Sequence, residues 1–349
     1  MLTSAPLKKC SREKDFLVIS GDAACDFDLK SFSREHFLSG ADVSVALYPH
    51  AEPLEYGTVV TDNEGNIINF IEKPPWERVV TDLVNTGIYM ISPKVLELIP
   101  KNHPFDFARD LFPILMERGF KLHGSVQKGY WCDIGNPKSY HKCCMDALDG
   151  KLKLKSSAAN ELSDSILSLN SLLCRDISLG KNCEFMRSVI HPGSFIGENS
   201  KIIDSVVDNA TIGKNCVIEG AVICEGAVIP DGTFVCKGAV VSSNPAPASS
   251  LTLSSSPKKR RCQGLVQEFS CKSRARLMRE MSSYLIESGA DFSDGISLNE
   301  GNCKVRISPM ADDCALTIEA DGGREADRLS ACQKYASLAK QLELYSNIQ

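Results

Sequence analysis

Short hydrophobic runs alternate with helical stretches over residues 15–148. The run Phe16–Ser20 is continuous and ends in Gly21-Asp22, which predicts a strand buried on both faces whose carboxyl end opens onto a site. The same alternation predicts further elements, namely helices at 29–38, 93–99, 106–117 and 137–148, strands at 43–48 and 84–91, and a hairpin pairing 58–60 with 67–70. Residues 1–150 are therefore predicted to form an α/β domain with a mostly parallel sheet.

A repeat replaces this alternation over residues 179–241. Hydrophobic turn starts recur every sixteen or seventeen residues, at Leu179–Cys183, Ile196–Ser200, Ile212–Cys216 and Ile229–Thr233. A hydrophobic residue followed by glycine or a small polar pair suits hexapeptide coils, in which three short strands make each triangular turn and the aliphatic side chain points inward. Four such starts reach the number of coils that buries a continuous core, so the repeat predicts a left-handed β-helix.

The remaining segments divide into two linkers and a third domain. Residues 151–178 are predicted to be a connector, and residues 242–266, rich in Ser, Pro and Ala, a flexible basic linker. Residues 267–349 are predicted to form a small α+β domain. Its elements are expected as a helix at 272–288, short strands near 295–297, 304–307 and 315–318, and a helix at 325–342.

Charge and composition narrow the partners. The formal net charge is -5, which gives no general attraction to nucleic acid or anionic membrane. Hydrophobic runs fall short of the roughly 18 to 20 residues that span a bilayer, and the N-terminus lacks the core of a signal peptide, so we expect a cytoplasmic protein. The basic run Lys258–Arg261 is interpreted as part of a solvated linker; the alternative is a nucleic-acid-binding patch.

The fifteen cysteines are scattered and odd in number. Without a secretory signal this argues against a disulfide framework, so we expect reduced thiols. Cys143 and Cys144 have no partner pair at zinc-like spacing, and we interpret them as buried small residues.

Polar motifs follow several predicted strands. Asp22 stands at the carboxyl end of the first strand, where open α/β sheets place ligands, and Asp133 stands before the closing helix. Three motifs lie between them, Tyr56-Gly57, Glu72-Lys73-Pro74 and Asn85-Thr86-Gly87. Each motif alone is typical of a turn or a strand end. Carboxylates that hold Mg²⁺, with a lysine near phosphate, are nevertheless what joining two anionic substrates requires.

The order and spacing of these motifs resemble the sugar-1-phosphate nucleotidyltransferase family. The phrases Pro53–Gly57, Pro104–Phe107 and Gly129–Asn136 are similar to its mannose-1-phosphate guanylyltransferase branch, in the long form fused to a phosphomannomutase-like region. The resemblance implies a Rossmann-like domain followed by a β-helix, and transfer of GMP from GTP to mannose 1-phosphate, giving a sugar nucleotide and pyrophosphate.

The resemblance also implies roles for single residues. Asp22 and Asp133 would bind Mg²⁺, and Lys73 would contact the sugar phosphate, so these three are the expected catalytic residues. The expected substrate-binding residues are Tyr56, Gly57, Glu72, Lys73, Asn85, Thr86 and Gly87.

The C-terminal domain resembles the last domain of phosphohexomutases. The similarity lies in Arg274–Glu280 and in Asp294-Gly295-Ile296. The loop Ser308–Cys314 is in the position that would bind phosphate, but it contains two acidic side chains, which repel phosphate. The phosphoserine segment of mutases is also absent. We therefore expect no mutase activity.

The front of the chain departs from the family. Residues 1–14 contain no Gly-x-Gly-Thr-Arg-Leu loop, which in the family holds the triphosphate, so we expect the chain as given to turn over poorly and to expose the edge beside Phe16–Ser20. The alternative function is a non-catalytic regulatory or assembly subunit that uses the β-helix for interaction. The β-helix is a candidate surface for homo-oligomer contacts under either hypothesis.

Overall fold

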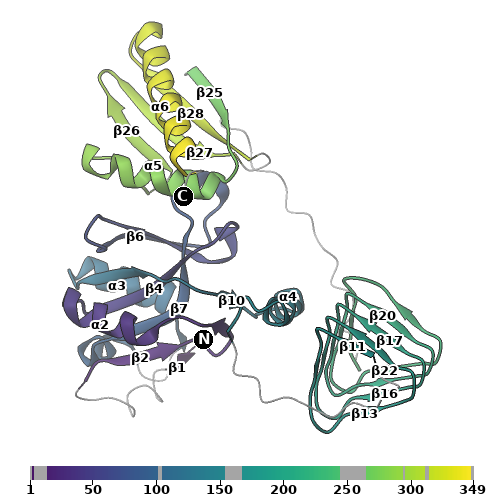
Figure 1. Cartoon of the computed structure of the whole chain (residues 1–349). Coiled ribbons are helices and arrows are strands. Elements are labelled where there is room, and N and C mark those ends of the chain that lie inside the picture. The colour runs from purple at the N-terminus through teal and green to yellow at the C-terminus, as the bar shows by residue number, and fades with distance from the viewer. Residues whose placement is uncertain are drawn as a thin grey trace. The chain divides into compact units, whose positions relative to one another are not determined.

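The computed structural model describes residues 2–3, 14–100, 104–153, 167–243, 265–293, 295–310 and 314–346. The chain forms two compact units (Figure 1). Unit 1 comprises Met1–Ser20, Asp28–Lys128 and Pro257–Gln349, and unit 2 comprises Gly21–Phe27 and Gly129–Ser256. The basic run Lys258–Arg261 and the acids of the 308–314 loop lie outside the described residues.

A mixed sheet forms the first domain of unit 1. Its strand order is β6-β5-β7-β4-β9, and β2 pairs with β7 beside β5. The strands are β2 (Phe16–Ile19), β4 (Val43–Pro49), β5 (Gly57–Thr61), β6 (Ile67–Glu72), β7 (Leu83–Ile91) and β9 (Leu122–Val126); a separate short pair joins β1 (Leu2–Thr3) to β8 (Pro104–Phe105). Only β4 and β9 run parallel in the described part of the sheet.

The predicted mostly parallel sheet is therefore wrong. The central strand β7 runs antiparallel to both β2 and β4, and the β5–β6 hairpin adds another antiparallel pair. A continuous hydrophobic run shows only that a strand is buried on both faces and does not encode its direction. The edge strand β2 is in fact only half covered, since Leu17 and Ile19 are exposed while Val18 is buried.

The helices of this domain follow local capping signals. Helix α2 (Leu29–Ser39) begins at Asp28, whose carboxylate accepts bonds from two backbone N–H groups, and ends at Gly40 in the left-handed conformation. The predicted helix at 93–99 is instead the 3₁₀ helix η3 (Pro93–Leu98). Residues 106–117 form a π-helical turn, η4 (Phe107–Leu111), and then α3 (Phe112–Glu117). Two short 3₁₀ turns, η1 (Pro53–Glu55) and η2 (Trp76–Arg78), flank the β5–β6 hairpin.

The C-terminal domain of unit 1 is a four-stranded antiparallel sheet with two main helices. The strand order is β25-β28-β27-β26. The elements are β25 (Leu265–Ser270), α5 (Arg274–Leu285), η5 (Ile286–Ser288), β26 (Ile296–Glu300), β27 (Cys303–Pro309), β28 (Ala315–Gly322) and α6 (Glu325–Ser346). The predicted α+β architecture is confirmed, except that β25, which crosses the predicted boundary between the linker and this domain, was not predicted. Its resemblance to phosphohexomutases stays a prediction.

Unit 2 begins with a small antiparallel pair and a helix. Strand β3 (Ala23–Cys25) pairs with β10 (Trp131–Asp133), and α4 (Pro137–Leu148) follows with Asn136 as its cap. The helix packs on one face of the β-helix through Met145, which contacts Val189 and Val206.

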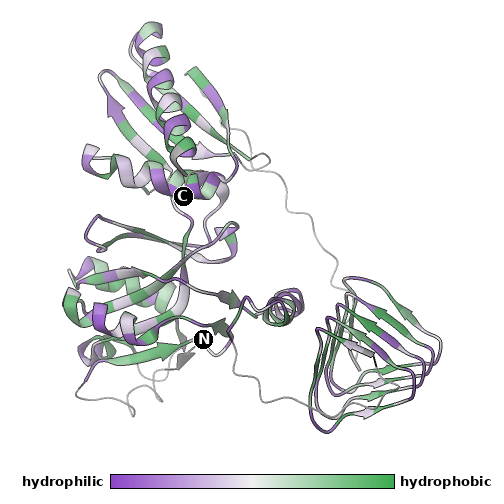
Figure 2. Ribbon diagram, in the orientation of Figure 1, coloured by the Kyte–Doolittle hydropathy of each residue, from purple (hydrophilic) through white to green (hydrophobic). Residues whose placement is uncertain are grey.

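The β-helix has three parallel sheets, one along each face (Figure 1). Hydrophobic and hydrophilic residues alternate along its coils, as Figure 2 shows, because each strand points alternate side chains inward and outward. The first sheet contains β11 (Leu167–Leu169), β14 (Glu184–Met186), β17 (Lys201–Ile203), β20 (Val217–Glu219) and β23 (Phe234–Val235). The second contains β12 (Leu172–Leu173), β15 (Val189–Ile190), β18 (Val206–Val207), β21 (Val222–Ile223) and β24 (Val240–Val241), and the third β13 (Ser178–Leu179), β16 (Phe195–Ile196), β19 (Thr211–Ile212) and β22 (Val228–Ile229).

The β-helix starts earlier than the sequence predicted. Its first coil begins at Leu167, within the segment assigned to the connector. This coil turns through Asn170 and Asp176, both at positive φ, where later coils often carry glycine. The prediction relied on glycine-containing turns and so missed the coil.

Candidate functional site

Two of the predicted motifs meet at the end of the β5–β6 hairpin. Gly57 pairs with Glu72 across the two strands. One residue further out, the backbone N–H of Lys73 donates to the carbonyl of Tyr56 at 3.0 Å. The hairpin thus brings Tyr56-Gly57 and Glu72-Lys73 face to face, although they are far apart in the sequence.

Glycine is required at this end of the hairpin. A Cβ atom on Gly57 would lie 2.6 Å from the ring of Phe70 and 2.7 Å from a carboxylate oxygen of Glu72. The absent side chain therefore leaves room for the Glu72 carboxylate over the strand. Burial raises the pKa of Glu72, and the charge of Asp106 adds to this effect, whereas Arg109 and Lys73 oppose it.

Lys73 has an unusual backbone conformation. Its φ is +44°, in the left-handed region, and it directly precedes Pro74. Non-glycine residues rarely adopt this region, and a following proline restricts the backbone further. Such conformations cost about 1–3 kcal/mol, persist only where the surroundings enforce them, and cluster at functional sites. The side chain of Lys73 is exposed to solvent.

The Asn85-Thr86-Gly87 motif forms a bulge in β7. Leu47 of β4 pairs with Asn85, but Val45 already pairs with Tyr89, so the three residues 86–88 oppose a single residue of β4. Gly87 makes the bulge possible with a φ of +75°. The Asn85 side chain accepts a bond from the Gly87 N–H at 3.0 Å and donates to the Tyr89 hydroxyl at 2.9 Å.

The role expected for Thr86 needs correction. Its side chain is buried, and its hydroxyl donates to the carbonyl of Ala46 at 2.7 Å. This bond ties the bulge to β4 and turns the hydroxyl into the sheet. Thr86 therefore supports the bulge and is not placed to bind substrate through its side chain.

The sequence prediction omitted three residues that act on this region. Asp106 and Arg109 influence the charge of Glu72, and Tyr89 holds the Asn85 amide. Burial raises the pKa of Tyr89 well above its ordinary value, so its hydroxyl stays protonated. Asp106 lies in one of the sequence phrases that supported the family resemblance. Its local role is to cap the η4 turn, because its carboxylate accepts hydrogen bonds from the N–H groups of Ala108 and Arg109.

The two predicted metal ligands lie at the same end of the β3–β10 pair of unit 2, with Asp133 at the end of β10 and Asp22 just before β3. Asp133 pairs with Ala23, the neighbour of Asp22, and the N–H of Ile134 donates to the Asp22 carbonyl at 2.9 Å. The two aspartates therefore occupy adjacent backbone positions. Among the described residues no group of three or more His, Cys, Asp or Glu side chains could hold a metal ion. Two carboxylates, completed by water and substrate oxygens, fit Mg²⁺, which commonly uses few protein ligands.

A buried network of thiols and charged groups lies behind Asp133. Cys132 and Cys143 share a hydrogen bond, which lowers the pKa of Cys132 and raises that of Cys143. Asp146 accepts from the Tyr130 hydroxyl at 3.0 Å and pairs with Lys142 and Lys151. Every cysteine in the described ranges is a free thiol.

No described helix is long and apolar enough to cross a bilayer.

Two protein families match consecutive parts of the chain. Residues 5–150 match the family described as nucleotidyl transferase, and residues 157–242 match the GlmU-like, C-terminal hexapeptide family. The C-terminal domain lies beyond both matched ranges.

Curated relatives match more than half of the chain. A UTP–glucose-1-phosphate uridylyltransferase from Synechocystis sp. is 30% identical over 216 residues, which cover 61% of this chain and 53% of the relative. A glucose-1-phosphate adenylyltransferase from Bacillus cytotoxicus is 32% identical over 237 residues, which cover 62% of each chain. The chain thus spans about half to three-fifths of the length of these relatives. Both matched families and both relatives agree with the motifs described above: residues 5–150 are similar to nucleotidyl transferases, and residues 157–242, which include the β-helix, are similar to a hexapeptide family.

Proposed function

We propose that the protein transfers a nucleotidyl group from a nucleoside triphosphate to a sugar 1-phosphate and releases pyrophosphate. The hairpin end carries this proposal, because it sets Glu72 and Lys73 opposite Tyr56-Gly57 and holds Lys73 in a strained conformation. The motif resemblance favours mannose 1-phosphate and GTP. Glucose 1-phosphate with UTP or ATP is the competing pair, since the named relatives act on glucose 1-phosphate.

Each residue of the hairpin end and the bulge has a proposed task. Lys73 binds the sugar phosphate as a point charge. Glu72, beside Gly57, accepts hydrogen bonds from sugar hydroxyls. Asn85 is fixed by bonds to Gly87 and Tyr89, so its amide is oriented before the substrate arrives.

Asp22 and Asp133 are proposed to hold Mg²⁺. Asp22 directly precedes β3 and Asp133 ends β10, so the two residues are close along the paired backbones, which supports a shared cation. When bound, the ion neutralises charge on the phosphates. The residues of this chain position the sugar phosphate, since catalysis of such transfers relies mainly on positioning and electrostatic stabilisation.

An assembly role is the second candidate, favoured by one observation on the β-helix. Phe195 and Val228 point outward from the same sheet and are exposed by 47% and 70%. Hydrophobic side chains on one flat face suit a contact between copies of the chain. Sedimentation experiments at several protein concentrations, with and without substrate, test this role. A chain that stays monomeric under all these conditions would exclude it.

The test is a binding and turnover experiment on residues 1–349. Isothermal titration measures the affinity for mannose 1-phosphate and glucose 1-phosphate with Mg²⁺, and pyrophosphate release measures turnover with GTP, UTP or ATP. Lys73→Met should weaken sugar-phosphate binding at least tenfold, whereas Lys340→Met, an exposed lysine on α6, should not. The function is refuted if the wild-type chain binds neither sugar phosphate. If Lys73→Met changes only nucleotide affinity, the assignment of Lys73 to the sugar phosphate is wrong.

A further inference from the structure

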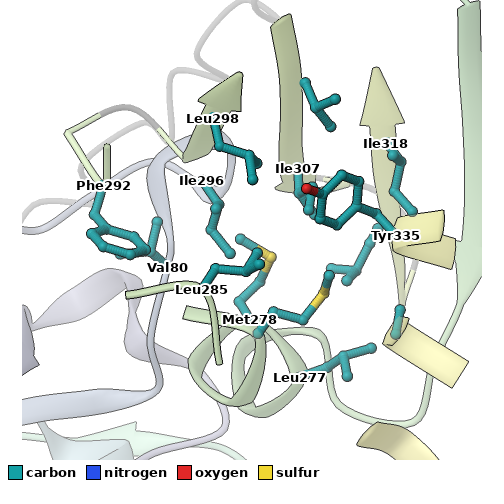
Figure 3. Close-up of a cluster of buried hydrophobic side chains, with 14 of the residues drawn as sticks. Val80, Leu277, Met278, Leu285, Phe292, Ile296, Leu298, Ile307, Ile318 and Tyr335 are labelled. Carbon is teal, nitrogen blue, oxygen red and sulfur yellow. The ribbon is translucent and has the colours of Figure 1, made fainter. Parts of the chain in front are cut away.

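The C-terminal domain and the nucleotidyl transferase domain share one hydrophobic core. Val60 and Val80 come from the first domain, yet they pack in the same cluster as Met278, Leu285 and Ile296. Figure 3 shows Val80 beside Phe292 and Leu285 in this cluster. Val80 is 0% exposed and Val60 5% exposed. The C-terminal domain therefore packs against the hairpin region and completes its burial.

Polar contacts fix the orientation of helix α5 on this surface. The Ser282 hydroxyl donates to the Val80 carbonyl at 2.7 Å, and Arg279 pairs with the buried Asp82 at 3.0 Å. Two loop contacts add to these, Asn69 to the carbonyl of Phe292 at 2.9 Å and Arg78 to that of Ser293 at 2.9 Å. Buried charge pairs and directed hydrogen bonds specify one docking geometry.

A close backbone approach supports the same docking. Gly295 has a φ of +78°, and a Cβ there would lie 3.2 Å from the carbonyl oxygen of Glu77 in η2. Only glycine combines this conformation with such a short separation. The η2 turn thus lies directly against the C-terminal domain.

Helix α5 contacts the hairpin end at two points. The guanidinium of Arg274 stacks over the ring of Trp76 at 3.4 Å from the ring centroid. Leu54, two residues before Tyr56, packs in one cluster with Ala275 and Trp76. Arg274 also donates to the carbonyl of Met310, so its guanidinium is held from its own domain as well.

We propose that helix α5 positions the sugar-phosphate-binding hairpin end, with Arg274 as a positioning residue that acts through Trp76 on Lys73. Only Pro74 and Pro75 separate Lys73 from Trp76, and proline has a fixed φ, so this link is stiff. A fixed Trp76 therefore helps to enforce the left-handed backbone of Lys73, which would otherwise relax. This inference rests on the proposed role of Lys73 in binding the sugar phosphate.

The test compares sugar-phosphate affinity in variants of the full chain. Arg274→Met removes the charge and the planar stacking on Trp76, and Arg274→Lys keeps the charge. Leu54→Ala reduces the packing against Ala275 and Trp76 without changing α5. Arg324→Met is the matched control, because Arg324 is exposed and forms an ion pair with Asp327 of its own domain. Titration with mannose 1-phosphate and glucose 1-phosphate is the main readout, alongside thermal melting.

A spectroscopic readout separates positioning from folding. The chain has two tryptophans, so Trp131→Phe leaves Trp76 as the single emitter. Sugar phosphate should change the emission of Trp76 in this background, and the change should disappear with Arg274→Met. A residue that only supports folding would lower the melting temperature without uncoupling Trp76 from the ligand.

We expect Arg274→Met to weaken sugar-phosphate binding roughly three- to thirtyfold, which is the range that one cation–π contact corresponds to. Leu54→Ala should also weaken binding, but by a smaller factor. The affinity of Arg274→Lys should lie between those of the wild-type chain and Arg274→Met. Wild-type affinity in both Arg274→Met and Leu54→Ala, while Lys73→Met loses binding, would overturn this inference and leave the proposed function intact. Absence of binding by the wild-type chain would instead overturn the proposed function and this inference with it.

Discussion

Val80→Ala should destabilise the C-terminal domain, although Val80 belongs to the first domain of unit 1. Val80 is 0% exposed and lies in the cluster formed mainly by the C-terminal domain. The substitution removes two methyl groups, about 1.6 kcal/mol at about 0.8 kcal/mol for each buried carbon. The cavity left behind adds to this, so the total should be about 2–3 kcal/mol. Domains are stable by only about 5–15 kcal/mol, so the effect is measurable.

Hydrogen exchange followed by mass spectrometry can locate this loss. Backbone amides of α5 and β26 should exchange roughly 30- to 150-fold faster in Val80→Ala than in the wild-type chain, which is the same free energy expressed as a ratio. Val207→Ala is the matched control, because Val207 is also 0% exposed but belongs to the core of the β-helix. It should leave exchange in α5 unchanged.

The result that refutes the shared core is specific. If Val80→Ala accelerates exchange in β5 and β7 but leaves α5 and β26 at wild-type rates, the two domains unfold independently. The packing between Val80 and α5 would then contribute little to stability, and helix α5 could not brace the hairpin end.

Three further predictions concern single positions. Gly57→Ala should weaken sugar-phosphate binding in titrations, since the new Cβ would lie 2.6 Å from the Phe70 ring. Asp146→Asn should lower the urea midpoint of unit 2 at pH 7, and this effect should shrink as the pH falls below the ordinary pKa of 3.8. Burial raises the pKa of Asp146, but hydrogen bonds from Lys142, Lys151 and Tyr130 outweigh burial and lower it. The stabilisation is therefore fully present above the ordinary pKa and is lost as the pH falls through the lower folded-state pKa. Asn199→Val should destabilise the β-helix by about 1–2 kcal/mol in thermal melts, because φ there is +58°, whereas Asn199→Gly should cost less.

Local patterns in the sequence predicted most of the elements. Helix α4 begins at Pro137 and ends at Leu148 as expected, since a proline at the first position and an asparagine cap mark its start. The hairpin was visible from its turn, where Asp62 accepts from the N–H groups of Glu64 and Asn66. Repeating turns revealed the β-helix. Each of these signals is short-range and needs no knowledge of the partner segment.

The direction of strands and the strain at Lys73 depend on tertiary partners and could not be predicted in this way. Strand β7 lies between β2 and β4, and its antiparallel orientation follows from how the chain connects them. The left-handed backbone of Lys73 contradicts local preference, since the residue is neither glycine nor asparagine and precedes a proline. Local backbone preferences therefore fail most clearly at Lys73, the residue with the strongest proposed role in binding. Such failures are expected at functional sites, where the backbone is often strained.

One overlooked signal in the sequence points to the docked domain. Val79 and Val80 follow the η2 turn and belong to no strand or helix, yet both are 0% exposed. Two adjacent valines in a loop would cost free energy if they faced water, at about 25 cal/mol per Å² of apolar surface. A loop that carries them therefore requires a covering element, and helix α5 supplies it through Ala275 and the Ser282 bond to the Val80 carbonyl. Because the η2 turn that precedes these valines begins three residues after Lys73, covering the valines and positioning the lysine are consequences of the same contact.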